Sequence, residues 1–172
     1  DTTAPAAPVI TTDTELTNIN TPTIVGTAEA GSTVELFNGA ISLGTETAGS
    51  DGSFSITSSQ LPDNDYTLTV KATDALGNKS TASNELAITI DATAPSTPSI
   101  TTTAALTNNN TPVIEGTAEA GSTVELFNGD TSLGTATAGS DGAFSVTSSQ
   151  LADNSYTLTV KATDAAGNIS DA

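Results

Sequence analysis

The 172-residue sequence contains no cysteine, histidine, arginine, methionine or tryptophan, and several of these absences exclude a class of function. Without cysteine the chain forms no disulfide, no zinc–thiolate site and no thiol nucleophile. Without histidine and arginine it lacks the commonest general base and the commonest oxyanion clamp. A carboxylate pair could still cleave glycosides, but such a site needs sugar-stacking aromatic rings, and aromatics make up only 3% of the chain. We therefore predict that the chain is not an enzyme.

Positive charge is also scarce, because three lysines face 20 acidic residues and the formal net charge is −17. Nucleic acids and anionic membrane surfaces are bound through cationic side chains, so both are excluded as partners. No apolar run approaches the roughly 18 residues of a membrane span, and we expect no membrane insertion. The acidic excess has two interpretations: it provides solubility through self-repulsion, or part of it binds divalent cations.

An internal repeat dominates what the sequence does contain. The segment GTAEAGSTVELFNG begins at Gly26 and again at Gly116, and YTLTVKATDA begins at Tyr66 and again at Tyr156, so both recur after 90 residues. No insertion or deletion interrupts this register. We predict two domains, residues 1–90 and 91–172, and because the chain stops at Ala172 the second copy should lack its final strand.

Alternating apolar and polar residues predict short β-strands in each copy, with turn residues between them. Asn38-Gly39 is a hairpin signal, and Thr11–Thr21 is interpreted as a polar turn. Tyr66 follows a tight corner, where sandwich folds place a tyrosine whose hydroxyl bonds back to the backbone. Seven strands in about 90 residues are typical of an immunoglobulin-like β-sandwich. The residues expected to point into the core are Ile24, Val34, Leu36, Phe54, Ile56, Tyr66, Leu68, Val70, Ala72, Leu86, Ile88 and Ile90.

The motifs together resemble a known family. The order D-x-T-A-P, GTAEAGSTVELF, DGSFS or DGAFS, and YTLTVKATDxxGNxS is similar to the bacterial Ig-like (Big) repeats in the extension regions of biofilm-associated and RTX-type adhesins. The resemblance implies a cysteine-free sandwich on the bacterial cell surface, outside the cell. It implies an extender role that supports adhesion and biofilm formation, with calcium bound at domain junctions. The expected partners are neighbouring repeats of the same chain, and we expect a monomer.

Two other function classes stay open. The first is an adhesive module that itself binds a glycan or a protein, and the second is an accessory domain of a secreted polysaccharide-degrading enzyme. A binding module should show a patch of exposed aromatic residues or an irregular long loop in one copy. The sequence indicates neither, because the loops have equal lengths in the two copies.

The strand directions predict where calcium would bind. The linker 91–95 is short and Pro95 and Pro98 favour extended neighbours, so the two domains are predicted to stack end to end. Turn carboxylates would then gather near the junction and repel one another unless a cation such as calcium, which takes six to eight oxygens, intervenes. The alternative is that these are solvated aspartates that suit tight turns. The candidate ligands are Asp91, Glu119, Asp141, Asp164, Asp63 and Asp65 at the junction, and Asp1, Glu29, Asp51 and Asp74 at the equivalent pole of the first copy.

Overall fold

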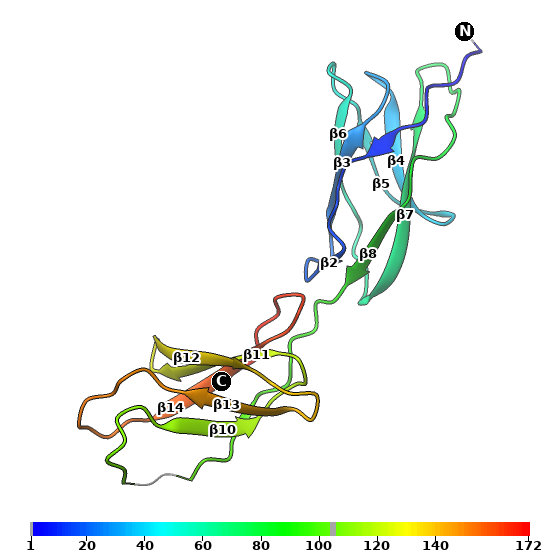
Figure 1. The fold of residues 1–172 in the computed structure, drawn as a ribbon. Helices are drawn as coiled ribbons and strands as arrows, with labels where there is room; N and C mark the ends of the chain where they lie inside the picture. Colours follow the sequence, from blue (N-terminus) through cyan, green and yellow to red (C-terminus); the bar gives the residue numbers. More distant parts are fainter. Residues whose placement is uncertain (1, 104–105) are drawn as a thin grey trace. The chain divides into compact units, whose positions relative to one another are not determined.

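A computed structural model describes residues 2–103 and 106–172 of the chain, and it consists of β-strands and loops (Figure 1). The chain divides into two compact units, Asp1–Ala92 (unit 1) and Thr93–Ala172 (unit 2). The predicted boundary followed residue 90, and the structural one follows Ala92. Within the described residues, no helix has the length and apolar character that a membrane crossing needs.

Unit 1 is a sandwich of two sheets, as the alternation of apolar residues predicts. One sheet has the order β1-β3-β6, and the other has the order β2-β8-β7-β4-β5. All neighbouring strands are antiparallel except β2 and β8, which are parallel. The strands are β1 (Val9–Ile10), β2 (Leu16–Thr17), β3 (Thr23–Thr27), β4 (Thr33–Asn38), β5 (Ile41–Thr47), β6 (Ser53–Thr57), β7 (Asn64–Thr73) and β8 (Leu86–Ile90).

Unit 2 repeats this plan with two three-stranded sheets, β13-β10-β9 and β12-β11-β14. The pairing registers match those of unit 1 shifted by 90 residues; for example, Leu36 faces Val70 and Leu126 faces Val160. The strands are β9 (Ser99–Ile100), β10 (Val113–Thr117), β11 (Thr123–Asn128), β12 (Thr131–Thr137), β13 (Ala143–Thr147) and β14 (Leu158–Thr163).

The prediction that Thr11–Thr21 is only a polar turn is wrong. Leu16 and Thr17 form β2, which pairs in parallel with Thr89 and Ile90 at the end of β8. The chain therefore crosses from the three-stranded sheet, where β1 pairs with β3, to the five-stranded sheet. Two residues are too few to show the period-2 alternation by which strands are recognised, and the pairing depends on a distant partner.

The core of unit 1 lies between the sheets and is built from small aliphatic side chains with a single phenylalanine, Phe54. Every residue that the sequence predicted to point inward is buried, except that Tyr66 is half-buried against the edge of the core. The Tyr66 hydroxyl donates to the Pro62 carbonyl at 2.8 Å, which confirms the predicted tyrosine corner. Its counterpart in unit 2, Tyr156, donates to the Ala152 carbonyl at 3.0 Å.

Gly26 in β3 lets the aromatic ring of Phe54 pack across the strand. A Cβ atom added at Gly26 would lie 2.1 Å from the Val9 carbonyl oxygen and 2.5 Å from the Phe54 ring. Gly116 faces Ser99 and Phe144 in the same way, at 2.0 Å and 2.5 Å. The glycine is therefore a packing requirement of the strand interior, where this residue usually weakens a strand.

The residues described in unit 2 include no counterpart of β8. In the described part of unit 2, β14 pairs on one side with β11, whereas β7 in unit 1 also pairs with β8. The strand β14 starts at Leu158, whereas β7 starts at Asn64, which corresponds to residue 154. Leu158 and Leu151 are only partly buried, whereas their counterparts Leu68 and Leu61 are buried.

Candidate functional site

Three turns of unit 1 carry the candidate ligands Glu29, Asp51 and Asp74, and they lie together at one end of the unit. In chain order these turns are residues 29–32, 49–52 and 74–78. The Ala28 N–H donates to the Gly52 carbonyl at 2.8 Å, and the Gly31 N–H donates to the Ala48 carbonyl at 3.0 Å. Thr73, which precedes the third turn, pairs with Thr33 directly after the first turn. Figure 1 shows these loops at the end of unit 1 that also holds the N-terminus. The backbone therefore brings the turns together, as the strand directions predict.

The carboxylate of Asp51 is held within its own turn. Its Oδ1 accepts hydrogen bonds from the Ser53 N–H at 3.0 Å and the Ser53 hydroxyl at 2.7 Å. These bonds, the backbone one first, lower the pKa of Asp51 below its usual value, so the group is ionised at neutral pH. In unit 2 the serine is replaced by alanine, and Asp141 Oδ1 accepts only the Ala143 N–H, at 3.0 Å.

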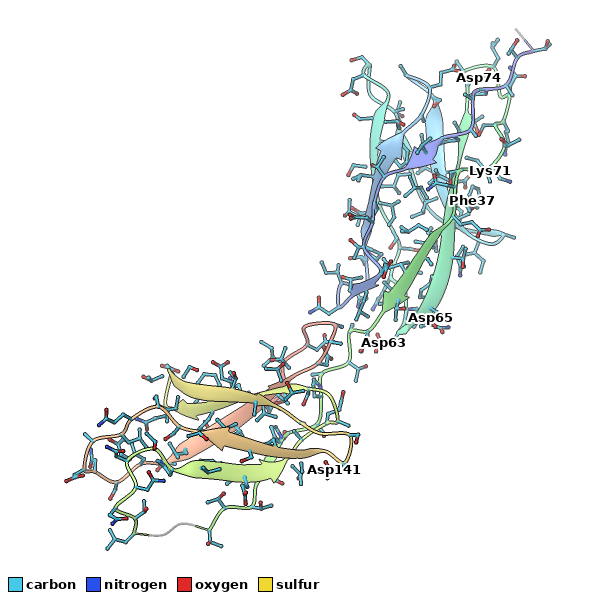
Figure 2. All side chains as sticks on the ribbon, in the orientation of Figure 1. Phe37, Asp63, Asp65, Lys71, Asp74 and Asp141 are labelled. Atoms are coloured by element: carbon cyan, nitrogen blue, oxygen red, sulfur yellow. The ribbon has the colours of Figure 1, made fainter. Side chains whose placement is uncertain are left out.

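Asp74, labelled in Figure 2, lies at the same end of unit 1. Both of its carboxylate oxygens accept hydrogen bonds inside its turn. Oδ1 accepts the N–H groups of Leu76 at 2.9 Å and Asn78 at 2.8 Å, and Oδ2 accepts the Asn78 side-chain amide at 2.7 Å. The Asn78 side chain is the main cause of the lowered pKa of Asp74. In unit 2, partial burial opposes ionisation of Asp164, but bonds from Asn168 outweigh it, and the pKa of Asp164 is lowered as well.

Three further predicted ligands lie where the chain leaves unit 1. Asp63 Oδ1 accepts the Ala92 N–H at 2.9 Å, and Asp65 Oδ1 accepts the Thr89 hydroxyl at 2.6 Å. The Asp91 N–H donates to the Thr17 carbonyl at 3.0 Å, which places Asp91 in unit 1 and not in the second copy to which its position in the repeat assigned it. Asp63 and Asp65 therefore anchor the end of β8 and the residues after it.

Glu29 and Glu119 take part in their turns through their carbonyl groups, which accept the Ser32 and Ser122 N–H groups at 3.1 Å in each unit. Asp1 lies outside the described residues. Across residues 2–103 and 106–172, no three acidic side chains come close enough to hold a metal ion.

The acidic side chains of the described residues therefore form no preformed calcium site. Calcium needs six to eight oxygen ligands, and both oxygens of Asp74 and of Asp164 already accept hydrogen bonds from their own turns. The turn aspartates act as local acceptors for backbone N–H groups, which was the alternative interpretation of these residues. The prediction of calcium at the junction of the two domains stays a prediction.

The aromatic residues fall into three groups: core, corner and outward-facing. Phe54 and Phe144 belong to the cores, and Tyr66 and Tyr156 form corners, but Phe37 and Phe127 point outward from β4 and β11 and are half-buried. The sequence contains the signal for this outward position, because Leu36 points inward and the next side chain of a strand points to the opposite face. Lys71, on the neighbouring strand β7, lies over the Phe37 ring at 5.8 Å from its centroid (Figure 2).

Residues 9–92 and residues 94–172 each match the family described as bacterial Ig-like domain. The chain belongs to the bacterial Ig-like family. Its two copies are consecutive domains of that family, and together they account for nearly the whole chain. Domains of this sandwich class are typically non-catalytic modules within longer proteins.

Two curated relatives share about a third of their residues with this pair of bacterial Ig-like domains. Chitinase A1 of Niallia circulans is 34% identical over 187 residues, covering 100% of this chain and 25% of the relative. Exoglucanase B of Cellulomonas fimi is 33% identical over 181 residues, covering 99% of this chain and 16% of the relative. The chain therefore spans at most a quarter of the length of these relatives.

A solved structure supports the fold. The fibronectin(III)-like modules of Clostridium thermocellum CbhA match with a TM-score of 0.55 at 17% identity, covering 95% of this chain and 89% of theirs. At this identity the likeness concerns the fold alone. The sandwich of the bacterial Ig-like domains is thus shared with modules of the fibronectin type.

Proposed function

We propose that the two bacterial Ig-like domains are extender repeats, which set the reach of a longer extracellular bacterial protein and carry tension along it. The observation that supports this most strongly is the path of the chain through unit 1. It enters along β1, which pairs with the Thr27 end of β3 beside the turns, and it leaves from Ile90, which pairs with Asn64 at the opposite end. Tension applied through the chain therefore acts along the length of the sandwich.

The parallel pair β2–β8 resists such tension. Leu16 and Thr17 face Thr89 and Ile90, and two further bonds extend the pair: the Thr89 N–H donates to the Glu15 carbonyl at 2.7 Å, and the Asp91 N–H donates to the Thr17 carbonyl at 3.0 Å. The first strand follows the N-terminal entry and the second precedes the exit. Pulling on the two ends shears these hydrogen bonds together, and bonds that share a load break at a higher force than bonds that open one after another.

Single-molecule force spectroscopy of the whole chain tests this role. Asp91→Pro removes the N–H that bonds to Thr17, whereas the matched control Asp91→Ala removes the same side chain and keeps the N–H. We expect unit 1 of Asp91→Pro to unfold at a clearly lower force than unit 1 of Asp91→Ala, at similar thermal stability. Equal unfolding forces would contradict a mechanical role for the β2–β8 pair.

The identity of the parent protein is inferred from the sequence motifs. We propose that the parent protein is a cell-surface adhesin in which the repeats hold a distal region away from the cell and so serve adhesion and biofilm formation. The acidic charge and the lack of arginine support a monomer that repels its own copies. Deleting one 90-residue repeat from the parent protein should shorten its reach from the cell surface and leave binding by the distal region intact.

Calcium at the junction is a separate proposal that rests on the abundance of turn carboxylates in the sequence. Isothermal calorimetry at millimolar calcium, the range of extracellular modules, is the direct measurement, with the double variant Asp91→Asn/Asp164→Asn as comparison. The proposal requires that the natural chain binds and that the double variant binds more weakly. If the natural chain releases or absorbs no heat of binding at these concentrations, the extender role stands without calcium.

A second candidate is an accessory spacer within a secreted polysaccharide-degrading enzyme. The names of the two curated relatives, a chitinase and an exoglucanase, favour it. In both candidates the repeats have the same mechanical task, and what differs is the neighbouring domain. The coding sequence on either side of this chain discriminates between them: a catalytic domain supports the enzyme, and further repeats with a surface anchor support the adhesin.

A further inference from the structure

The outward face of the β4 sheet differs from the rest of the surface in its charge and in its pattern of hydroxyl groups. This platform consists of three rows that run across strands β5, β4 and β7. The first row is Thr47–Thr33–Thr73, the second is Thr45–Glu35–Lys71, and the third is Ser42–Phe37–Thr69.

The hydroxyl groups of the platform are available to a ligand. Within the described residues, no side-chain hydrogen bond engages the hydroxyls of these five threonines and one serine. On the other sheet, by contrast, only some of the described outward hydroxyls are unpaired, such as those of Thr27 and Ser55. Thr23 bonds to Thr57 at 3.1 Å, and the Thr12 hydroxyl is engaged by the Val25 N–H at 2.8 Å. The platform therefore offers unpaired donors and acceptors in each of its three rows.

The platform carries no net charge. Glu35 and Lys71 face each other across β4 and β7 and are its only charged residues. The rest of residues 1–90 carries ten acidic residues and one lysine. A polyanion would be repelled by the surrounding surface, and a second copy of this chain would be repelled as well, because the net charge is −17. The ligand that suits this face is uncharged.

The aromatic ring supplies the apolar part of the site. Phe37 stays half-exposed at the edge of the platform, flanked by Ser42 and Thr69. The ammonium of the exposed Lys71 lies over its ring, 5.8 Å from the centroid, so a sugar that stacks there must displace this side chain. A pyranose ring has an apolar face of C–H groups that packs flat on an aromatic ring, while its hydroxyls bond to polar side chains around it. A flat row of hydroxyls beside a phenylalanine therefore has the chemistry that recognises sugar rings.

The two copies show that this face has stayed constant while the opposite one has changed. Every platform residue has an identical counterpart in unit 2, with pairing in the same register. On the outward face of the other sheet, Val9, Thr23, Val25 and Ser53 are replaced by Ser99, Val113, Glu115 and Ala143. The four replaced residues are exposed, whereas four of the unchanged platform residues are half-buried. The exposed platform residues are nevertheless unchanged as well, and they are Thr33, Ser42, Thr45, Thr47 and Lys71. The unit 2 platform consists of Thr137, Thr123, Thr163, Thr135, Glu125, Lys161, Ser132, Phe127 and Thr159.

We propose that the platform of each unit binds an uncharged polysaccharide, with Phe37 and Phe127 stacking against sugar rings and the threonine hydroxyls bonding to sugar hydroxyls. A chain with one platform per repeat binds a polymer at two points, so weak contacts add through avidity. Through this contact an extender would attach along its length to a polysaccharide matrix. The inference does not depend on the extender role.

Binding of the whole chain to insoluble cellulose and insoluble chitin, measured by depletion from solution, tests the proposal, with the anionic polymer alginate as comparison in affinity electrophoresis. We expect retention on at least one uncharged polymer and none on alginate. The double variant Phe37→Ala/Phe127→Ala should bind about tenfold more weakly, because a stacking contact is lost in each unit. Absence of binding to both uncharged polymers, or binding to alginate alone, would overturn the proposal.

A second set of variants keeps the test decisive if the phenylalanine variant fails to fold. Replacing Thr45, Thr69, Thr135 and Thr159 by valine removes hydroxyls, keeps the shape and keeps β-propensity. The matched control is Thr23→Val, on the opposite face, which unit 2 already carries at Val113. We expect the platform variant to lose binding while its melting temperature stays close to that of the natural chain, and the control to bind normally. If platform and control variants bind equally well, the face only stabilises the sheet.

Discussion

At the scale of single residues, Gly26 and the turn aspartates explain why particular residue types are needed. Gly26 has no room for a side chain because β1 and the Phe54 ring both lie against it. Asp51 and Asp74 occupy turns in which their carboxylates accept hydrogen bonds from the backbone N–H groups of Ser53, Leu76 and Asn78. Local packing explains the glycine, and local hydrogen bonding explains the two aspartates.

The first prediction concerns Gly26→Ala. The added methyl group would lie within 2.1 Å of the Val9 carbonyl oxygen, so β1 or Phe54 must move. Overpacking of this kind costs about 1–3 kcal/mol, and we expect calorimetry of the whole chain to show unit 1 melting at a lower temperature. Ser55→Ala, on the exposed face of β6, is the control and should change stability by less than about 0.5 kcal/mol. An unchanged melting temperature for Gly26→Ala would show that β1 is not held against β3.

The second prediction is a loss of stability in acid. The folded pKa values of Asp51, Asp74 and Asp164 lie below the ordinary aspartate value of 3.8, because turn hydrogen bonds favour the ionised forms. Their contribution to stability is therefore complete above the unfolded pKa and disappears as the pH falls below about 4 through the folded values. Asp74→Asn should reduce the pH dependence of the melting temperature between pH 5 and pH 2.

The comparison variant for this titration is Asp130→Asn, in the exposed hairpin of unit 2. Its pH dependence should stay closer to that of the natural chain than that of Asp74→Asn. A melting temperature of Asp74→Asn that falls with acid as steeply as in the natural chain would assign the acid sensitivity to other carboxylates.

At the scale of elements, the difference between the two units lies in one strand. β8 places Leu86, Ile88 and Ile90 in the core of unit 1 and also supplies the partner for β2. The described part of unit 2 has no strand equivalent to β8 or to β2, and Leu158 is less buried than Leu68. One strand therefore completes a sheet and closes one side of a core.

The third prediction is that adding this strand stabilises unit 2. Eight residues copied from Ser83–Ile90 and attached after Ala172 should bury three aliphatic side chains, each worth about 1.5–3 kcal/mol, against the ordering cost of the added segment. We expect the melting temperature of unit 2 to rise by about 4 °C or more, as measured by calorimetry. An extension of equal length with serine at the three apolar positions is the control. Equal melting temperatures for the two extensions would show that the strand does not dock.

At the scale of the whole molecule, the relevant quantity is the length that each repeat contributes. The ten residues of β7 span about 33 Å at 3.3 Å per residue, and turns extend the unit at both ends. The short linker with Pro95 and Pro98 restricts how the chain continues into the second copy.

The fourth prediction is an extended particle in solution. If the repeats follow one another end to end, small-angle X-ray scattering should give a maximum dimension of at least roughly 70 Å, about twice the strand length. Measurements with calcium and with a chelator show in addition whether calcium stiffens the chain. A maximum dimension close to that of one unit would contradict the end-to-end arrangement.

The sequence by itself determined the fold class, the 90-residue internal repeat and the core residues of this protein. Alternation of apolar residues assigns each side chain to one face of a strand, and a 90-residue register carries that assignment to the second copy, so the buried residues and the tyrosine corner followed from local patterns. Tertiary structure alone decided β2, because a two-residue strand exists only through its pairing with β8, far along the chain. It also decided what the carboxylates do, because hydrogen bonds within each turn, which composition does not reveal, already engage the oxygens of Asp74 and Asp164. The platform around Phe37 also depends on tertiary structure, because only the pairing of β5, β4 and β7 brings its three rows together on one face.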